Sequence, residues 1–384
     1  MTRDTRNPDP GRSALPGTPD GSVVTTSTCR VPLEALGRRG PLPPVLRAGD
    51  LVEVEVTRPG YAFEDGAIEG RIAEGRCATV PVRGGLRLIA AVGHRDAADE
   101  YVARLPRRLG PPLHLCAPCG LVSRVEGNAV QRPPTEVRLL AAVVDAEGRV
   151  LRTRAYPLAA PPAPPRPRSG LIAFVADRMN AGKSTAVLAC LRALGRAGHR
   201  VAAGKVTGTA RLRGLLQARE AGACAAEDFS SLGYPSTCLV PGPALQRLLV
   251  DLHAYLDASA DGGSVLLELA DGWGQRENRA LLESGYLGRN GARTVLCLSG
   301  LGDPWQQVLD FQGELGVAVT AVSGRACADG RVRRELLDRG VACFDARTAD
   351  EGALAECLLG QRDAPAPDLA PRLAGLDDTA PEVA

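Results

Sequence analysis

Lysine is nearly missing from this sequence. Two of its 46 Lys+Arg residues are lysines, Lys183 and Lys205, and arginine supplies the positive charge elsewhere. A compact ammonium on a thin stem fits into a backbone cradle around a phosphate group, whereas the wide planar guanidinium does not. Lys183 lies in a Gly-Lys-Ser-Thr segment and Lys205 in a Gly-Lys-Val-Thr-Gly segment. This pattern indicates that Lys183 contacts the phosphates of a nucleotide.

Long apolar runs, basic stripes and aromatic residues are scarce as well. No apolar run approaches the length that spans a bilayer, and the first residues lack the apolar core of a secretory signal. We therefore expect a cytoplasmic protein without a membrane partner. The 46 basic and 44 acidic residues are spread along the chain and give a net charge of +2, which argues against a nucleic acid partner. Aromatic residues make up 3%, so the cores must be packed by Ala, Val and Leu.

The 11 cysteines show no disulfide framework. Most lie within apolar segments, as Cys190 and Cys297 do, which is typical of small core residues in a reducing compartment. Cys116 and Cys119 form one Cys-x-x-Cys pair with His114 nearby, but the second pair that a structural zinc site needs is missing. We interpret these residues as plain thiols, with metal or redox use as the alternative.

Composition divides the chain into two domains with a linker and two tails. Its 384 residues exceed the usual size of one domain. Residues 1–28 and 362–384 are polar, rich in Pro and without hydrophobic periodicity, which predicts disordered tails. The Pro-rich segment 156–169 predicts an extended linker. The two domains would then comprise residues 29–155 and 170–361.

The two domains differ in their hydrophobic patterns. Short alternating runs separated by Gly, Pro and Asp predict a mostly β domain, a small barrel or sandwich without a catalytic constellation, and they occupy residues 51–56, 66–72, 86–92 and 136–144. After the linker, buried strands are expected at 171–176, 200–206, 264–269, 294–299, 317–322 and 341–344, with helices that include 184–197 and 243–258. The predicted fold class is α/β, a parallel sheet with helices on both faces preceded by a smaller mostly β domain.

The predicted strand that begins at residue 171 leads through a short loop into a helix. This is the context of a P-loop, in which backbone N–H groups and the helix N-terminus face nucleotide phosphates. The expected nucleotide-binding residues are Asn180, Ala181, Gly182, Lys183, Ser184 and Thr185. Lys183 would span the β and γ phosphates, and Ser184 would offer its hydroxyl to Mg²⁺. Asp177 replaces the first glycine of the usual pattern, and Asn180 lies where such loops need a positive φ.

These motifs resemble the ATP-binding half of dethiobiotin synthetase and its relatives, including cobyrinic acid amidating enzymes and MobB-type nucleotide-binding proteins. The resemblance rests on Ala176–Thr185 and His199–Gly208 and covers about residues 170–345. The family loop, G-T-D-T-G-V-G-K-T, also lacks glycine at the first position, and the family's second strand ends in K-P-V-x-x-G. The resemblance implies ATP and Mg²⁺ as cofactors, and it implies that Lys205 points at the γ-phosphate or an acidic substrate. A solvated lysine at a strand end is the alternative.

Acidic residues follow the predicted strands. The family carries E-G-A-G-G after a central strand, where its Glu binds Mg²⁺, and Glu268 takes that place here. A carboxylate that ends an apolar strand is costly to bury unless it meets a cation, which favours Glu268 as a metal ligand. Asp271 replaces a glycine of the family sequence and adds a candidate catalytic carboxylate. Asp228 is either a third metal ligand or a loop cap.

Further segments are candidates for the substrate and base sites. Residues 232–237 are rich in hydroxyl groups and either line a substrate pocket or form an ordinary turn. Arg276 is a candidate neighbour of the acceptor, and residues 323–325 lie where such proteins select the nucleotide base. No base-reading residue is identified, so ATP rather than GTP rests on the resemblance.

Three functions remain open. The first is a Mg·ATP-dependent ligase or kinase that activates or phosphorylates a small acidic substrate, with Lys183, Lys205 and Mg²⁺ compensating charge that leaves the γ-phosphate. The second is a nucleotide-dependent switch or accessory protein whose β domain holds a partner. The third is a non-catalytic module for a phosphorylated ligand, which the acids near the site disfavour because they indicate a metal. A homodimer is possible under any of the three. The acceptor itself cannot be named from the sequence.

Overall fold

The computed structural model describes residues 21–360, apart from residues 62, 64, 65, 73–75, 109, 111 and 163–165. The expected C-terminal tail lies outside the described residues, as do residues 1–20 of the expected N-terminal tail. Ordered chain begins earlier than residue 29, with strand β1 (Val23–Val24) and the 3₁₀ turn η1 (Thr26–Thr28). Ser22 is fully buried and its hydroxyl donates to Glu53. Hydrogen bonds to the rest of the domain therefore hold this segment in place, although its sequence is polar and has no hydrophobic pattern.

The N-terminal half is mostly β, as the alternating pattern predicts. A nine-stranded sheet has the order β1-β6-β3-β11-β9-β10-β8-β7, with β2 paired to β11, among the described residues. Its other strands are β2 (Arg39–Gly40), β3 (Leu51–Arg58), β6 (Arg87–Ala91), β7 (Arg95–Asp96), β8 (Tyr101–Arg104), β9 (Leu113–Leu115), β10 (Val122–Asn128) and β11 (Glu136–Val143). A separate hairpin comprises β4 (Ala67–Ile72) and β5 (Arg76–Pro81), and the short turns are η2 (Leu33–Gly37) and η4 (Thr153–Ala155).

The C-terminal half is a parallel α/β sheet, which confirms the predicted fold class. Seven strands lie in the order β14-β13-β15-β12-β16-β17-β18, and every pairing is parallel. The strands are β12 (Gly170–Ala176), β13 (Val201–Lys205), β14 (Ala225–Asp228), β15 (Ser264–Glu268), β16 (Arg293–Cys297), β17 (Ala321–Ser323) and β18 (Ala342–Cys343). The helices are α1 (Lys183–Arg196), α2 (Leu212–Glu220), α3 (Gly242–Ala260), α4 (Arg276–Leu282), α5 (Tyr286–Arg289), α6 (Pro304–Leu315), α7 (Gly330–Asp338) and α8 (Glu351–Leu359), with 3₁₀ turns η5 (Phe229–Leu232) and η6 (Arg325–Ala328).

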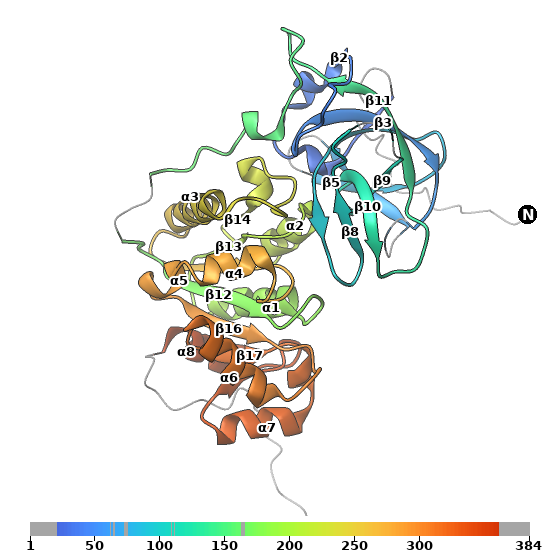
Figure 1. The fold of residues 1–384 in the computed structure, drawn as a ribbon. Helices are drawn as coiled ribbons and strands as arrows, with labels where there is room; N and C mark the ends of the chain where they lie inside the picture. The colour runs from blue at the N-terminus through green and yellow to red at the C-terminus, as the bar shows by residue number, and fades with distance from the viewer. Residues whose placement is uncertain are drawn as a thin grey trace, which may run out of the picture.

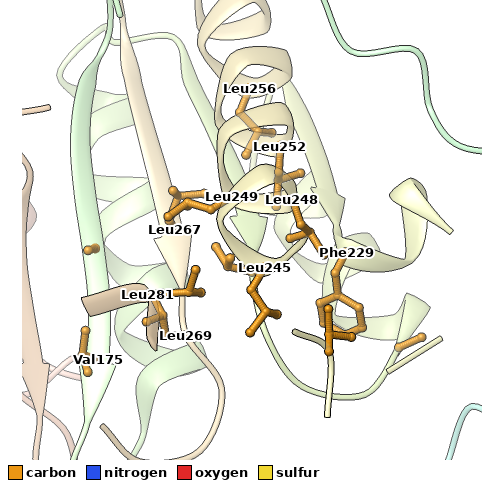
Figure 2. Packing of buried hydrophobic residues seen from close by; sticks show 14 of the residues in the cluster. Val175, Phe229, Leu245, Leu248, Leu249, Leu252, Leu256, Leu267, Leu269 and Leu281 are labelled. Atoms are coloured by element: carbon orange, nitrogen blue, oxygen red, sulfur yellow. The ribbon is translucent and has the colours of Figure 1, made fainter. Parts of the chain in front are cut away.

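Strand β12 shows why both faces of this sheet are covered. Successive side chains of a strand point to opposite faces. Leu171, Ala173 and Val175 belong to one buried cluster with α3, whereas Ile172 and Phe174 belong to another with α1 and α8. Figure 2 shows Leu249 of α3 beside Leu267 of β15, with Leu269 and Leu281 nearby and Val175 farther from α3, on β12. Because helices cover both faces of this sheet, side chains on both sides of its strands must be apolar, as they are in β12.

One strand of the parallel sheet begins later than predicted, and another was not predicted. Residues 317–320 precede β17 because the backbone N–H of Val319 donates to the side chain of Gln312 in α6 (3.0 Å). Strand β14 was not predicted, because its sequence ends in Glu227 and Asp228, which usually mark loops. Both carboxylates are buried and hydrogen-bonded here, Glu227 to Arg219 of α2 (3.0 Å) and Asp228 to the N–H of Ser230 (2.8 Å).

The β-rich half lies beside the parallel sheet at the side where strands β13 and β14 and helix α2 lie (Figure 1). One buried apolar cluster contains residues of both halves, including Cys119 and Phe229. Glu69 of β4 accepts a hydrogen bond from the N–H of Leu212, the first residue of α2 (3.0 Å). Arg211, the residue before α2, makes no capping hydrogen bond with its side chain. Glu69 of the β-rich half caps the helix instead. None of the described helices is long and apolar enough to cross a membrane.

Candidate functional site

The segment between β12 and α1 has the backbone of a P-loop. Asn180 has φ 59° and Gly182 has φ 103°, so both are in the left-handed region. The positive φ expected of Asn180 is confirmed, and Asn tolerates this conformation better than most side chains do. Gly182 precedes α1 directly, and no described side chain caps that helix. The first N–H groups of α1 therefore point to the loop, where an anion can accept their hydrogen bonds.

Asp177 occupies the position of the missing glycine and anchors the loop. Its carboxylate accepts hydrogen bonds from the N–H of Ser299 (3.0 Å) and from the hydroxyl of Ser299 (2.5 Å). Its own N–H donates to the carbonyl of Cys297 at the end of β16 (3.2 Å). The substitution therefore joins the phosphate loop to the segment between β16 and α6.

Lys183 is buried within the loop, with 6% of its surface exposed. Its Nζ donates to the carbonyl of Asp271 (2.6 Å) and to the carbonyl of Arg178 (3.3 Å). Burial lowers the pKa of Lys183, and the nearby carboxylate of Glu268 opposes this effect. Carbonyl oxygens hold the ammonium where phosphate oxygens, which are stronger acceptors, can replace them.

Ser184 and Glu268 form the candidate magnesium site. The hydroxyl of Ser184 lies 3.2 Å and 3.3 Å from the two carboxylate oxygens of Glu268. Mg²⁺ prefers oxygen ligands and takes few of them from the protein, leaving the others to phosphate and water. The pair fits that requirement. No group of three or more His, Cys, Asp or Glu side chains in the described part of the chain is placed to hold a metal by itself.

Lys205 lies beside this pair. Lys205 and Glu268 are register partners in β13 and β15, and the Nζ of Lys205 lies 3.5 Å from Oε1 of Glu268. The side chain of Lys205 retains one third of its exposure, whereas that of Glu268 retains 11%. Lys205 is thus a partly exposed cation that lines the cavity, where a ligand can reach the donors of its ammonium.

Asp271 adopts a left-handed conformation, with φ 55°, in place of the family's glycine. Burial raises the pKa of its carboxyl, and the charges of Lys205 and Lys183 oppose the rise. Two residues that the sequence analysis missed hold this segment: the hydroxyl of Thr207 accepts from the N–H of Ala270 (2.9 Å), and Asn278 donates to the carbonyl of Gly272 (2.8 Å). Their backbone partners leave no signature in the sequence.

Two glycines fit closely against the P-loop. A Cβ atom on Gly272 would lie 2.4 Å from the carbonyl oxygen of Asp177. A Cβ on Gly324, which has φ 97°, would lie 2.6 Å from the carbonyl oxygen of Ala181. Backbone segments that follow β15 and β17 thus approach the loop more closely than any side chain allows.

Asp228 ends β14 and is the register partner of Lys205. Burial raises its pKa to about 6, while hydrogen bonds from Ser230 and the charge of Lys205 lower it. Its carboxylate caps η5 by accepting from the N–H of Ser230 (2.8 Å), so the loop-cap alternative describes its geometry. Asp228 is not among the residues that line the cavity described below, and its role as a metal ligand stays a prediction.

A cavity of about 1330 Å³ lies at the carboxyl ends of β12, β13 and β15, where ligands bind in open α/β sheets. Its walls include the P-loop from Asn180 to Thr185, Lys205, Glu268 and Asp271. Of the hydroxyl-rich run, Ser236 and Thr237 line the cavity. Arg276 does not line it, and its guanidinium pairs with Glu277 (3.3 Å). Gly324 and Arg325 line the cavity at the expected base site.

The β-rich half completes the wall of this cavity, which the sequence analysis did not anticipate. Arg95, Glu100 and Glu69 line it from that side. Asp99 lies 3.4 Å from Nδ2 of Asn180 and 3.4 Å from the guanidinium of Arg178, both in the P-loop. Such contacts depend on how the two halves dock, and no local pattern encodes them.

Cys116 and Cys119 are buried in the β-rich half, and neither lines this cavity, although Pro118 between them does. Burial raises the pKa of both thiols, that of Cys116 to about 12. Nδ1 of His114 accepts a hydrogen bond from the N–H of Val125 (3.1 Å). Protonated, buried thiols are poor metal ligands and nucleophiles, which favours their interpretation as core residues.

No protein-family model and no curated protein matches the chain. Its fold is similar to that of the cell division protein FtsY from Thermotoga maritima, with 19% sequence identity, 54% of this chain and 72% of that chain covered, and a TM-score of 0.33. It is also similar to the signal recognition particle receptor FtsY from Elizabethkingia anophelis, with 16% identity, coverage of 52% and 68%, and a TM-score of 0.30. Likenesses at this level carry no inference about what this chain binds.

Proposed function

We propose that the chain is a Mg·ATP-dependent enzyme that activates or phosphorylates a small acidic substrate, as a ligase or kinase of the dethiobiotin synthetase type. The observation that carries the proposal is the position of Lys183, Lys205 and the Ser184–Glu268 pair around one cavity. Its volume of about 1330 Å³ exceeds what one small ligand usually needs, so a nucleotide and a second molecule fit together.

Each residue then has a role in phosphoryl transfer. Lys183 and the N–H groups of the P-loop bind the nucleotide phosphates, and Lys205 contacts the transferring group or the acceptor's carboxylate. Ser184 and Glu268 would hold Mg²⁺, which neutralises charge on the phosphate oxygens when bound. Asp271 carries a carboxyl whose pKa is raised by burial, a property expected of a group that exchanges a proton with an acceptor.

A second candidate is a nucleotide-dependent switch. The observation that favours it is the contact of Asp99, in the β-rich half, with Asn180 and Arg178 of the P-loop (both 3.4 Å). A loop that rearranges around phosphates would alter these contacts and so change how the β-rich half is held. This function requires no acceptor.

The deciding experiment measures nucleotide binding by calorimetry and nucleotide consumption by the full-length protein, with ATP and, separately, with GTP. Pools of small carboxylates and amines are added in turn, with Mg²⁺ present. We expect one pool to stimulate turnover well above basal hydrolysis. Nucleotide binding with only slow basal hydrolysis in every pool would favour the switch. Absence of binding to either nucleotide would refute both candidates.

A further inference from the structure

Arg95 is a buried cation in the wall of the cavity. It belongs to β7 of the β-rich half, and 7% of its surface is exposed. One guanidinium nitrogen donates to the carbonyl of Cys116 and another to the carboxylate of Glu100. The Nε–H is buried and has no hydrogen-bond partner among the described residues. Buried guanidinium donors are normally satisfied, so the unpartnered Nε–H of Arg95, a residue that lines the cavity, is a donor that an acceptor on a ligand can satisfy.

The backbone around Arg95 is fixed to both halves of the molecule. The following residue, Asp96, accepts a hydrogen bond at its carbonyl from Gln275, just before α4 (2.8 Å). The carbonyl of Arg95 itself accepts from Arg104 (2.5 Å), whose guanidinium also binds the carboxylate of Asp96 (2.7 Å). A guanidinium held this way loses little further freedom when it binds a ligand.

The charges around the cavity show which kind of ligand is missing. Lys205, Lys183 and Arg95, in that order, lower the pKa of the Asp271 carboxyl against the larger opposite effect of its burial. All three cations line the same cavity as Asp271. A planar guanidinium with donors to spare suits oxygen anions, which accept its hydrogen bonds in pairs.

We propose that Arg95 binds an oxyanion in this cavity, together with the P-loop domain, and that the oxyanion is either the terminal phosphate of the nucleotide or a carboxylate of the second substrate. The inference rests on the proposed function, because it assigns a residue of the β-rich half to the same site. The β-rich half is then part of the binding site and not only a neighbour of it. A merely structural role would instead make Arg95 and Glu100 a pair that holds β7 to its neighbours.

The test uses the full-length protein and four variants. Arg95→Gln removes the charge, Arg95→Lys keeps the charge without the fork of donors, and Glu100→Gln removes the competing carboxylate. Arg87→Gln is the matched control, because Arg87 is an exposed arginine of β6 outside the cavity. Thermal unfolding verifies that each variant folds. Should Arg95→Gln fail to fold, Arg95→Lys carries the test.

Calorimetry has two arms. In the first, Mg·ATP, Mg·GTP and Mg·ADP are titrated. If Arg95 binds the terminal phosphate, Arg95→Gln should weaken triphosphate binding about tenfold or more and leave ADP binding nearly unchanged.

In the second arm, acetate, malonate and succinate are titrated with and without saturating Mg·ADP. If Arg95 binds a carboxylate of the second substrate, Arg95→Gln should lose carboxylate binding and keep nucleotide binding. In either arm Glu100→Gln should bind the oxyanion more tightly, by a few-fold, because a competing anion is gone.

Two results would overturn the assignment of Arg95. The first is a folded Arg95→Gln that matches the parent in both arms. The second is a Glu100→Gln variant that loses oxyanion binding as severely as Arg95→Gln, which would show a structural pair. If the parent protein bound neither triphosphate, the proposed function would be refuted. The titrations of carboxylates without nucleotide would still test the assignment of Arg95.

Discussion

The hydroxyl of Ser184 lies 3.2 Å from Oε2 of Glu268, although 84 residues separate the two along the chain. Ser184 is the second residue of α1, and Glu268 is the last residue of β15, the strand next to β12. Parallel strands bring their carboxyl ends to one edge of the sheet, so the P-loop and an acid from the neighbouring strand meet there.

Replacing Lys183 should remove nucleotide binding. Its ammonium is buried and already bonded to two carbonyls, so Lys183→Ala deletes charge-assisted contacts to the phosphates and should weaken Mg·nucleotide binding by about a hundredfold or more. Lys183→Arg should do nearly as much harm, because the guanidinium is too wide for the loop. Calorimetry measures the affinity, and Arg247→Ala in α3, whose side chain is 80% exposed, is the control. Retained affinity in either Lys183 variant contradicts the P-loop assignment.

Replacing Glu268 should change the response to magnesium. Glu268→Gln keeps the shape of the side chain and removes its charge, so we expect a higher Mg²⁺ requirement and turnover lower by about tenfold or more. Nucleotide affinity should fall less, because the lost charge compensation matters chiefly in the transition state. Turnover measured across a Mg²⁺ titration checks this. An unchanged titration curve would move the role to Asp271 or Asp228.

Lys205 separates the enzyme from the switch. In the enzyme, Lys205→Ala should leave nucleotide affinity within a few-fold of the parent and lower acceptor-stimulated turnover by about a hundredfold, the effect of one lost electrostatic contact in the transition state. A switch has no acceptor, so basal hydrolysis should change little. Affinity and turnover are measured with and without the acceptor pools. No stimulation of the parent, together with equal basal rates, would decide for the switch.

Asp228 should make stability depend on pH. Its folded pKa of about 6 lies above the ordinary value of 3.8, so between these pH values the folded state holds a proton that the unfolded state has released. Stability from this group is therefore greatest below pH 4, declines as pH rises to about 6 and is constant above. Asp228→Asn removes the decline, and its stability relative to the parent should improve by about 2 kcal/mol between pH 4 and pH 7. Urea unfolding at several pH values measures the difference, and a parallel shift at all pH values contradicts it.

A fragment of residues 168–362 tests the two-domain interpretation. It contains Lys183, Ser184, Lys205 and Glu268, so we expect it to fold and to bind Mg·ADP, which lacks the terminal phosphate, within a few-fold of the whole chain. It lacks Glu69, the cap of α2, and should lose about 1 kcal/mol of stability from that contact. Hydrogen exchange of α2 should be faster than in the whole chain. A soluble whole chain that binds nucleotide, beside a fragment that does not, would mean that the β-rich half completes the nucleotide site.

The parts of the site that local sequence determines could be predicted. An apolar strand, a Gly-Lys-Ser-Thr segment and a helix are contiguous, so the P-loop and the left-handed Asn180 follow from the sequence order. The parallel sheet follows from alternating apolar strands and helices. Glu268 could be placed because acids at the ends of neighbouring parallel strands share one edge of the sheet.

The remainder depends on contacts between distant segments. Strand β14 could not be predicted because its acids are satisfied by Arg219 and Ser230, which lie outside the strand. The roles of Asp99 and Arg95 arise when the two halves dock, and neither residue lies in a recognisable motif. Thr207 and Asn278 bind backbone groups after β15, and backbone groups are the same in every sequence.

The close approach of Gly272 and Gly324 to the P-loop has a consequence for ancestry. Any chain that builds this site on the same backbone must carry glycine at both places, whatever its other residues are, because a methyl group there would lie within 2.6 Å of the loop's carbonyl oxygens. The two glycines follow different strands and are 52 residues apart, so no short sequence motif contains both of them. A spaced pattern of Gly-Lys-Ser-Thr followed by these two glycines can therefore mark distant relatives whose overall identity has become too low to reveal descent.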